Sequence, residues 1–151
     1  TGDLAISSAM LADVNQITIT RKSLMTIENL PSFHRVNQPD TLMIYLGGFH
    51  NQIRRDFIRK IADRNPEVSF FHFGDIDAGG FYIFEHLRKQ TGVDFKPYHM
   101  DRETLLQYRR NTKKLTDNDR KRLKKLVCGP FKDVIDYMLE HDCKLEQEAI
   151  D

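Results

Sequence analysis

Three short apolar runs constrain the fold of this chain more than any other feature. They are LMTI at 24–27, LMIYL at 42–46 and VSFFHF at 68–73. Each run is nearly continuous rather than alternating and is rich in strand-forming residues, a pattern typical of strands covered on both faces. We therefore expect three parallel strands in the core of an α/β domain.

The segments after the second and third runs have the period of a helix. In 50–65 apolar residues recur every three or four positions while basic residues occupy the other face, and 78–92 repeats the pattern, with Gly92 placed to end it. FKPYHM at 95–100 supplies a fourth short strand, which Pro97 confines to a sheet edge or a strand end. The alternation predicts an α/β fold with a mainly parallel sheet of about four strands flanked by helices.

The last third of the chain is predicted to be helical. Asp101 can cap a helix over 103–110, and Thr116 with Asp119 resembles a capping box that opens the next one. After Gly129 and Pro130, apolar residues form one stripe along a final helix. The alternating residues 17–20, near the start, are expected to form an outer strand.

Length and composition indicate one domain over residues 1–151. The chain has 151 residues, 40% of them apolar and 30% charged, which is ordinary for a soluble globular protein. No apolar window approaches the roughly 18 residues that span a bilayer, so we expect a cytoplasmic protein without membrane association. Cys128 and Cys143 are expected to be reduced thiols. Because the chain starts at Thr1, we expect a C-terminal fragment of a longer protein.

Acidic and glycine residues follow the three apolar runs. Glu28 and Asn29 come after the first, a glycine pair at 47–48 after the second, and Asp75 and Asp77 after the third. In open α/β sheets ligands bind outside the carboxyl ends of the strands, so these three ends should converge on one crevice. Residues at i and i+2 of an extended chain point the same way, so Asp75 and Asp77 should face the crevice together.

Three carboxylates in one crevice would attract a cation, and Mg²⁺ prefers such oxygen ligands. Gly79 and Gly80 would let a large substrate approach the backbone and let the following helix pack tightly. The alternative is that Asp75 and Asp77 are ordinary turn and N-cap residues, since aspartate commonly precedes a helix. Glu28 upstream favours the metal site.

Two histidines call for separate interpretations. His50, after the glycine turn, could orient a phosphate or transfer a proton. His72, inside the third run, is predicted to be a buried, hydrogen-bonded residue. No pair of histidines has the spacing of a zinc site.

In the order of its motifs the chain resembles a Toprim domain, the catalytic fold shared by topoisomerases, primases and several nucleases. Three stretches, IENLPSF at 27–33, FGDIDAGGFYI at 73–83 and LEQEAI at 145–150, are similar to the C-terminal Toprim domain of the Wadjet JetD proteins, which resemble the topoisomerase VI catalytic subunit. The resemblance covers the chain from about residue 17 onward.

The resemblance implies an Mg²⁺- or Mn²⁺-dependent endonuclease that hydrolyses double-stranded DNA. It also implies a role in a bacterial anti-plasmid defence system, in which the protein works with a condensin-like SMC complex. Glu28, Asp75 and Asp77 match the catalytic, metal-binding acids of the family, and Glu148, with Glu146, matches its late acidic motif. A homodimer, formed through an upstream region or through this domain, is a further expectation. The alternative for 145–148 is a solvated helix end.

Two other functions compete with the nuclease. One is a non-catalytic metal- and DNA-binding Toprim module that regulates a topoisomerase-like or SMC complex. The other is a phosphotransfer enzyme with an aspartate nucleophile, which Gly79 disfavours because such enzymes usually have Thr or Val two residues after the second aspartate. None of the five tyrosines has a motif that marks a DNA-attacking nucleophile, so hydrolysis is favoured over transesterification.

DNA contact is predicted for two basic segments. Nine of the seventeen residues at 109–125 are Lys or Arg, which could neutralise several phosphates, although a solvated helix face is the alternative. A second basic group lies on the helix predicted after the glycine pair. The candidate residues are Arg54, Arg55, Lys113, Lys114, Arg120, Lys121 and Lys124.

Overall fold

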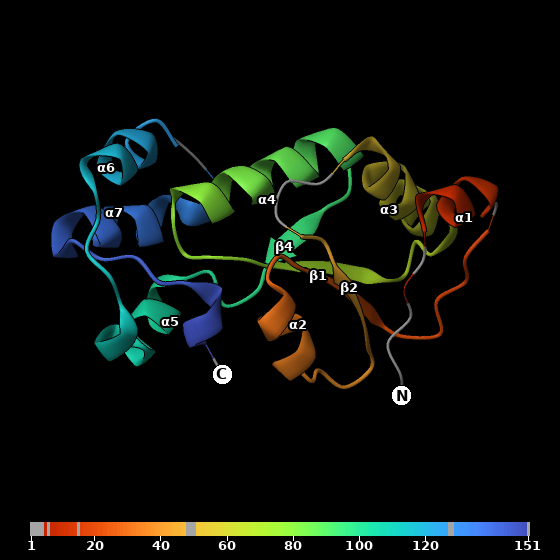
Figure 1. Cartoon of the computed structure of the whole chain (residues 1–151), viewed down its shortest axis with the longest axis horizontal. Coiled ribbons are helices and arrows are strands. Elements are labelled where there is room, and N and C mark those ends of the chain that lie inside the picture. Colours follow the sequence, from red (N-terminus) through yellow and green to blue (C-terminus); the bar gives the residue numbers. More distant parts are fainter. Residues whose placement is uncertain (1–4, 6, 15, 48–50, 127–128, 151) are drawn as a thin grey trace.

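A four-stranded, wholly parallel sheet forms the centre of the computed structural model, which describes residues 5, 7–14, 16–47, 51–126 and 129–150 (Figure 1). The strands are β1 (Ser23–Ile27), β2 (Thr41–Tyr45), β3 (Ser69–Phe73) and β4 (Phe95–Pro97), in the order β2-β1-β3-β4. The expected sheet is therefore confirmed. The strand that contains Pro97 is three residues long and lies at an edge, as its proline requires.

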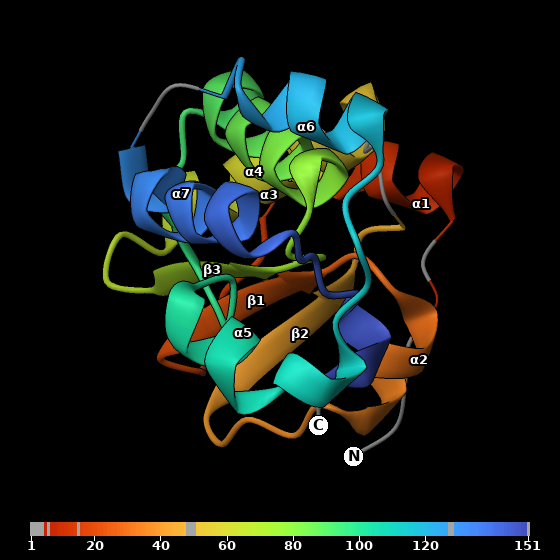
Figure 2. The same cartoon turned by 90° about the vertical axis from the view of Figure 1, so that its left-hand side faces the viewer.

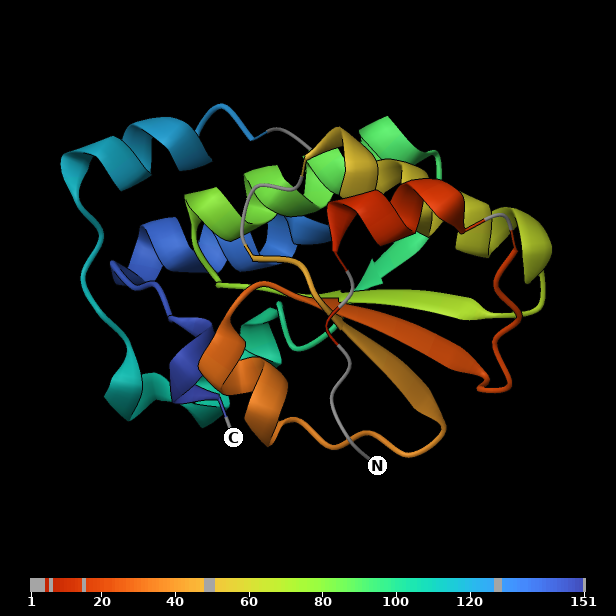
Figure 3. The same ribbon diagram turned by 45° about the vertical axis from the view of Figure 1, so that its right-hand side comes forward.

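Helices cover both faces of the sheet, which makes the fold three-layered (Figure 2). On one face lie α3, α4 and α1, with α6 and α7 beside them, and on the other lie α2 and α5 (Figure 3). The helices are α1 (Ser8–Asp13), α2 (Leu30–Arg35), α3 (Gln52–Arg64), α4 (Ala78–Thr91), α5 (Arg102–Gln107), α6 (Asp117–Leu123) and α7 (Lys132–His141), and short 3-10 turns are η1 (Arg109–Asn111), η2 (Gly129–Phe131) and η3 (Gln147–Ala149).

The order of the strands places a topological switch point between β1 and β3. From β1 the chain crosses to β2 on one side, and it then returns past β1 to form β3 and β4 on the other side. Connections that leave two neighbouring strands in opposite directions open a crevice at their carboxyl ends, where ligands of α/β proteins bind. The residues that follow β1 and β3 therefore share this crevice.

The predicted helix ends are confirmed by their hydrogen bonds. The Asp77 side chain accepts from the backbone N–H of Gly80 at the start of α4, and Gly92 ends that helix with φ +70°. Thr116 and Asp119 form the expected capping box of α6. Inside the core, the Phe81 ring stacks on Phe131 with centroids 4.4 Å apart, which joins α4 to the segment before α7.

Three predictions about the fold are wrong or incomplete. Residues 17–20 form no strand, because the Asn65 side chain takes the hydrogen bonds that a neighbouring strand would make, accepting from Ile19 N and donating to Ile17 O. β2 is an edge strand rather than a strand covered on both faces, and Tyr45 is 40% exposed. The six-residue helices α1 and α2 were not predicted, since each is too short to show a helical period.

Two further observations concern the membrane and the thiols. Among the described helices, none is both long and apolar enough to cross a bilayer. Cys143 is a free, buried thiol, whereas Cys128 lies outside the described residues.

Candidate metal centre

Glu28 and the Asp75–Asp77 pair lie where β1 and β3 end side by side. Ile27 is in register with Phe73, and the backbone N–H of Glu28 donates to Phe73 O at 3.2 Å, so the two strand ends are joined directly. Ile76, which lies between the two aspartates in the sequence, is fully buried. The sequence-predicted residues of the metal site thus come from adjacent strands at the switch point.

Glu28 is held from the side by a buried histidine. His72 Nε2 lies 3.0 Å from Glu28 Oε1, and His72 Nδ1 lies 2.8 Å from the hydroxyl of Thr26. His72 is fully buried and the Glu28 side chain is 8% exposed. The prediction of a buried, hydrogen-bonded His72 is confirmed, but its contact with Glu28 was not predicted, because the sequence does not show that positions 26, 28 and 72 are neighbours.

Asp75 has a strongly raised pKa. Burial raises its pKa, a hydrogen bond from Gln147 N opposes this, and the negative charges of Asp77, Glu28 and Glu146 raise it further, to about 6. Asp77, Glu28 and Glu146 therefore lie close enough to Asp75 for their charges to act on it. Proximity of a cation would favour the ionised form of Asp75.

Asp77 has a structural task as well as a possible chemical one. Its Oδ1 accepts from Gly80 N at 2.8 Å, so the alternative interpretation as an N-cap is confirmed for this residue. Gly80 packs so closely that a Cβ there would lie 2.2 Å from the backbone oxygen of Asp75, which explains the glycine by tight helix packing. At Gly79 the nearest atoms to a Cβ would belong to the Asp77 side chain, with Oδ1 at 3.1 Å.

The segment around η3 closes the site from the C-terminal side. Leu145 forms an antiparallel bridge with Ile76, and the fully buried Gln147 contacts both strand ends. Its side chain donates to Phe73 O at 2.9 Å and accepts from Asn29 N at 3.0 Å, and its backbone N–H donates to Asp75 Oδ1 at 2.7 Å. Gln147 was missed from the sequence, although it lies in the LEQEAI stretch that was singled out for its acids.

The two late acids are both exposed, Glu146 as the N-cap of η3 and Glu148 within it, but their partners differ. Glu148 is exposed and its Oε1 accepts from Asn29 Nδ2 at 2.7 Å, next to Glu28 in the chain. Glu146 pairs with Lys113 Nζ at 2.5 Å and is one of the groups that raise the pKa of Asp75. Between these two acids, Glu146 is the one whose charge acts on Asp75.

The predicted DNA-contacting residues fall into two groups. The side chains of the first group are hydrogen-bonded to other residues of this chain. Arg54 donates to Leu46 O, Arg55 to Gln52, Lys113 to Glu146 and Arg120 to Asp142. Lys114, Lys121 and Lys124 are exposed. The exposed lysines are therefore the better placed for phosphates, and contact with DNA stays a prediction.

The donor set fits a hard cation. Glu28, Asp75 and Asp77 each have one oxygen in a hydrogen bond within the described chain and a second oxygen that makes none there. Among the described residues, no group of three acidic, histidine or cysteine side chains is already drawn together at metal-binding distances. Mg²⁺ is usually held by one or two carboxylates with water and substrate phosphate oxygens, so an ion here would take only some of its ligands from these side chains. Gly48 and His50, also predicted near the crevice, lie outside the described residues.

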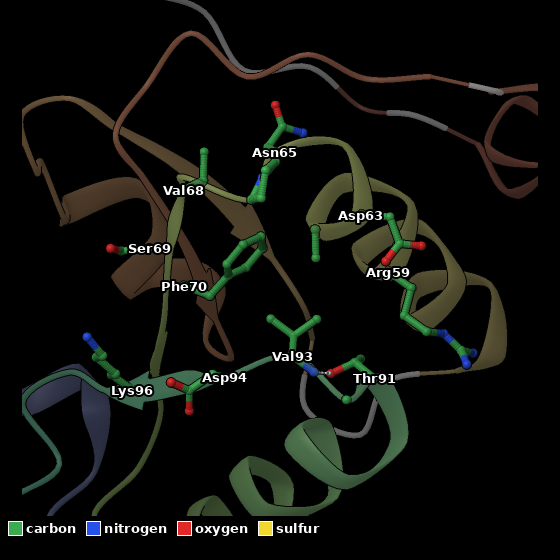
Figure 4. Close-up of a pocket in the computed structure, with 13 residues that line it drawn as sticks. Arg59, Asp63, Asn65, Val68, Ser69, Phe70, Thr91, Val93, Asp94 and Lys96 are labelled. Carbon is green, nitrogen blue, oxygen red and sulfur yellow. Dashed lines mark hydrogen bonds between the residues drawn. The ribbon is translucent and has the colours of Figure 1, made fainter.

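A hollow of the described surface lies near the start of β3, at the opposite end of that strand from Asp75. Its volume is about 420 Å³, and its walls include Asn65, Ser69, Thr91 and Lys96, around the start of β3 and the end of α4 (Figure 4). This hollow is lined by residues of both charges and lies far along β3 from Asp75, so it is separate from the acidic site. It contributes nothing to the chemistry of that site.

The fold and the site define a class: an α/β domain with an open parallel sheet and an acidic centre at its switch point. The family model of the C-terminal part of the Wadjet protein JetD matches residues 1–151, and the chain belongs to this family. It is 28% identical to the Wadjet protein JetD of Bacillus cereus (strain Q1) over 85% of this chain. The chain spans 34% of the length of that relative.

Proposed function

We propose that the chain is the Mg²⁺- or Mn²⁺-dependent, DNA-hydrolysing domain of a Wadjet-type defence protein. The observation that carries the proposal is the convergence of Glu28, Asp75 and Asp77 at the ends of β1 and β3, where burial and then the neighbouring negative charges raise the pKa of Asp75 to about 6. Such a site attracts a cation, and a cation held there would in turn bind the negatively charged oxygens of a phosphodiester. Membership of the JetD family supports the defence role.

Each acid has a distinct part in the proposed reaction. Asp75 and Asp77 would hold the metal ion through the oxygens that are not committed to Gln147 and Gly80. Glu28 would complete the site or take the proton of the attacking water. The bound ion would supply charge stabilisation for the phosphoryl transition state. Gln147 keeps Asp75 in place and His72 keeps Glu28 in place, each through a hydrogen bond.

The proposed substrate is double-stranded DNA, delivered by a condensin-like SMC complex. Exposed lysines at 114, 121 and 124 would neutralise phosphates beside the acidic crevice. An unregulated nuclease would damage its host, so cleavage is expected to require these partners. Constitutive cutting by the purified protein alone would contradict this gating.

A non-catalytic metal- and DNA-binding module is the second candidate. It is favoured by the absence, among the described residues, of any three donors already at metal-binding distances. It is also favoured by Asp77, which uses one of its two oxygens to cap α4. On this alternative the site would bind a cation and DNA, and the protein would regulate a topoisomerase-like or SMC complex.

Plasmid cleavage by the full-length protein with its partners tests the proposal. In the presence of Mg²⁺ or Mn²⁺, Glu28→Gln and Asp75→Asn should each abolish cutting, while Glu67→Gln, an exposed glutamate before β3, should cut normally. Equal cleavage by all four proteins would refute the assignment to these acids. Binding of metal and DNA without any cleavage by the wild type would support the second candidate.

A further inference from the structure

A buried chain of polar side chains runs behind Glu28. Thr26 on β1 and His72 on β3 are in register with each other, and both are fully buried. The Thr26 hydroxyl lies 2.8 Å from His72 Nδ1, and His72 Nε2 lies 3.0 Å from Glu28 Oε1. Two polar side chains in an otherwise apolar core are costly unless every group is paired, and here each is.

The donor and the acceptor in each hydrogen bond between Thr26, His72 and Glu28 follow from the chemistry of the groups. An ionised carboxylate can only accept, so His72 Nε2 donates to Glu28 Oε1. The Thr26 hydroxyl has one hydrogen and two neighbours that can accept it, His72 Nδ1 at 2.8 Å and Phe71 O at 3.4 Å. Donation over the shorter contact keeps the ring hydrogen on Nε2, where it can reach Glu28. The Phe84 ring, with its centroid 5.9 Å from that of His72, packs against the imidazole.

The glycine at position 74 is a second observation in favour of the Glu28–His72 contact, because a side chain there would collide with it. A Cβ at this position would lie 2.3 Å from Glu28 Oε1 and 3.1 Å from His72 Nε2. The φ angle of Gly74 is not positive, so its backbone does not require glycine. The space that the Glu28–His72 contact occupies is what excludes a side chain here.

We propose that His72 is a positioning residue of the acidic site, locked in turn by Thr26. It occupies Oε1 of Glu28 and leaves Oε2 as the oxygen that meets the metal ion or the attacking water. This inference rests on the proposed function. Neither residue touches the substrate, and both act through Glu28, as hydrogen-bond partners behind metal-binding carboxylates do.

Mn²⁺ binding to the full-length protein, measured by calorimetry at a fixed neutral pH, tests the inference with a readout other than activity. His72→Phe removes the donor, and Thr26→Val removes the hydroxyl at nearly constant volume. Each should weaken Mn²⁺ binding, about 10- to 100-fold for His72→Phe and less for Thr26→Val. His72→Gln, which keeps a side-chain N–H, and Thr26→Ser, which keeps the hydroxyl, should restore most of the affinity.

Thr91→Val is the matched control. Thr91 is also a buried threonine whose hydroxyl is hydrogen-bonded. It lies at the end of α4, away from the acidic site, where its hydroxyl accepts a hydrogen bond from Val93 N (Figure 4). This variant should bind Mn²⁺ like the wild type. If His72→Phe fails to fold, the Mn²⁺ affinities of Thr26→Val, Thr26→Ser and Thr91→Val test the inference instead.

The outcomes separate the two proposals. If Asp75→Asn loses Mn²⁺ while Thr26→Val and His72→Phe bind as tightly as the wild type, the positioning role is wrong and the metal site stands. If Asp75→Asn binds like the wild type, the metal site itself is wrong and the inference falls with it. Loss of affinity in Thr26→Val with recovery in Thr26→Ser would support the inference.

Discussion

The backbone N–H of Gln147 donates a 2.7 Å hydrogen bond to Asp75 Oδ1, so a residue 72 positions away in the sequence holds the central acid of the site. The Gln147 side chain bonds the ends of β1 and β3 at the same time. One buried residue therefore ties together the segments that carry Glu28 and Asp75.

Gln147→Ala should lower the free energy of unfolding by about 1–3 kcal/mol, because it leaves Asn29 N and Phe73 O without their partner in a buried place. Urea unfolding followed by circular dichroism measures this. Gln90→Ala, an exposed glutamine on α4, is the control and should change little. Equal stability of the two variants would show that the Gln147 bonds are not important for the fold.

Asp75→Asn should stabilise the metal-free protein at neutral pH. The folded pKa of Asp75 is about 6, against an ordinary 3.8, so its contribution to stability is complete below pH 3.8 and is lost as the pH rises through 6. The variant's advantage should therefore grow between pH 4 and 6, to at most about 3 kcal/mol. Urea unfolding across this range measures it, with exposed Asp63→Asn as a control. A pH-independent difference would contradict the shifted pKa.

Mg²⁺ should raise the melting temperature of the wild type, because a cation that binds the folded state stabilises it by mass action. The increase should be smaller or absent in Asp75→Asn, and Asp63→Asn should respond like the wild type. Differential scanning calorimetry at neutral pH, with NaCl at matched ionic strength as the blank, makes this comparison. Identical responses of all three proteins would place the bound cation elsewhere.

Gly80→Ala and Gly79→Ala should differ although they are neighbours in the first turn of α4. A Cβ at 80 would lie 2.2 Å from a backbone oxygen that cannot move away, and the resulting overpacking should cost about 1–3 kcal/mol or more. At 79 the neighbour is a side chain, and alanine favours a helix by up to about 1 kcal/mol. Thermal unfolding of both variants tests this, and equal melting temperatures would contradict the close contact.

Lys121→Ala with Lys124→Ala should weaken DNA binding and lower the salt dependence of the affinity by about 0.9 per phosphate contact that is lost. The double variant Lys89→Ala with Lys96→Ala removes the same charge from exposed positions at the other end of the domain. Fluorescence anisotropy of labelled duplex DNA at several salt concentrations compares them. If both variants lose affinity equally, the predicted basic surface has no special role.

Much of the fold could be predicted because its signals are local. The periods of α3 and α4, the cap at Asp77 and the stop at Gly92 are all visible within a few residues. For the site, the sequence predicted only which strand ends lie together. That much follows because parallel strands align their carboxyl ends. The contacts of His72 and Gln147 depend on side chains from distant segments, and the failed strand at 17–20 depended on Asn65, which lies 46 residues after Ile19.

The register between β1 and β3 has a further consequence. Ile27 faces Phe73 across the ladder, and that pairing alone sets Glu28 beside Gly74 and Thr26 beside His72. Side chains alternate between the two faces of a strand, so a slip of one residue would turn His72 away from Thr26. A single codon inserted within either strand would therefore leave the amino-acid composition almost unchanged and yet dismantle the acidic centre.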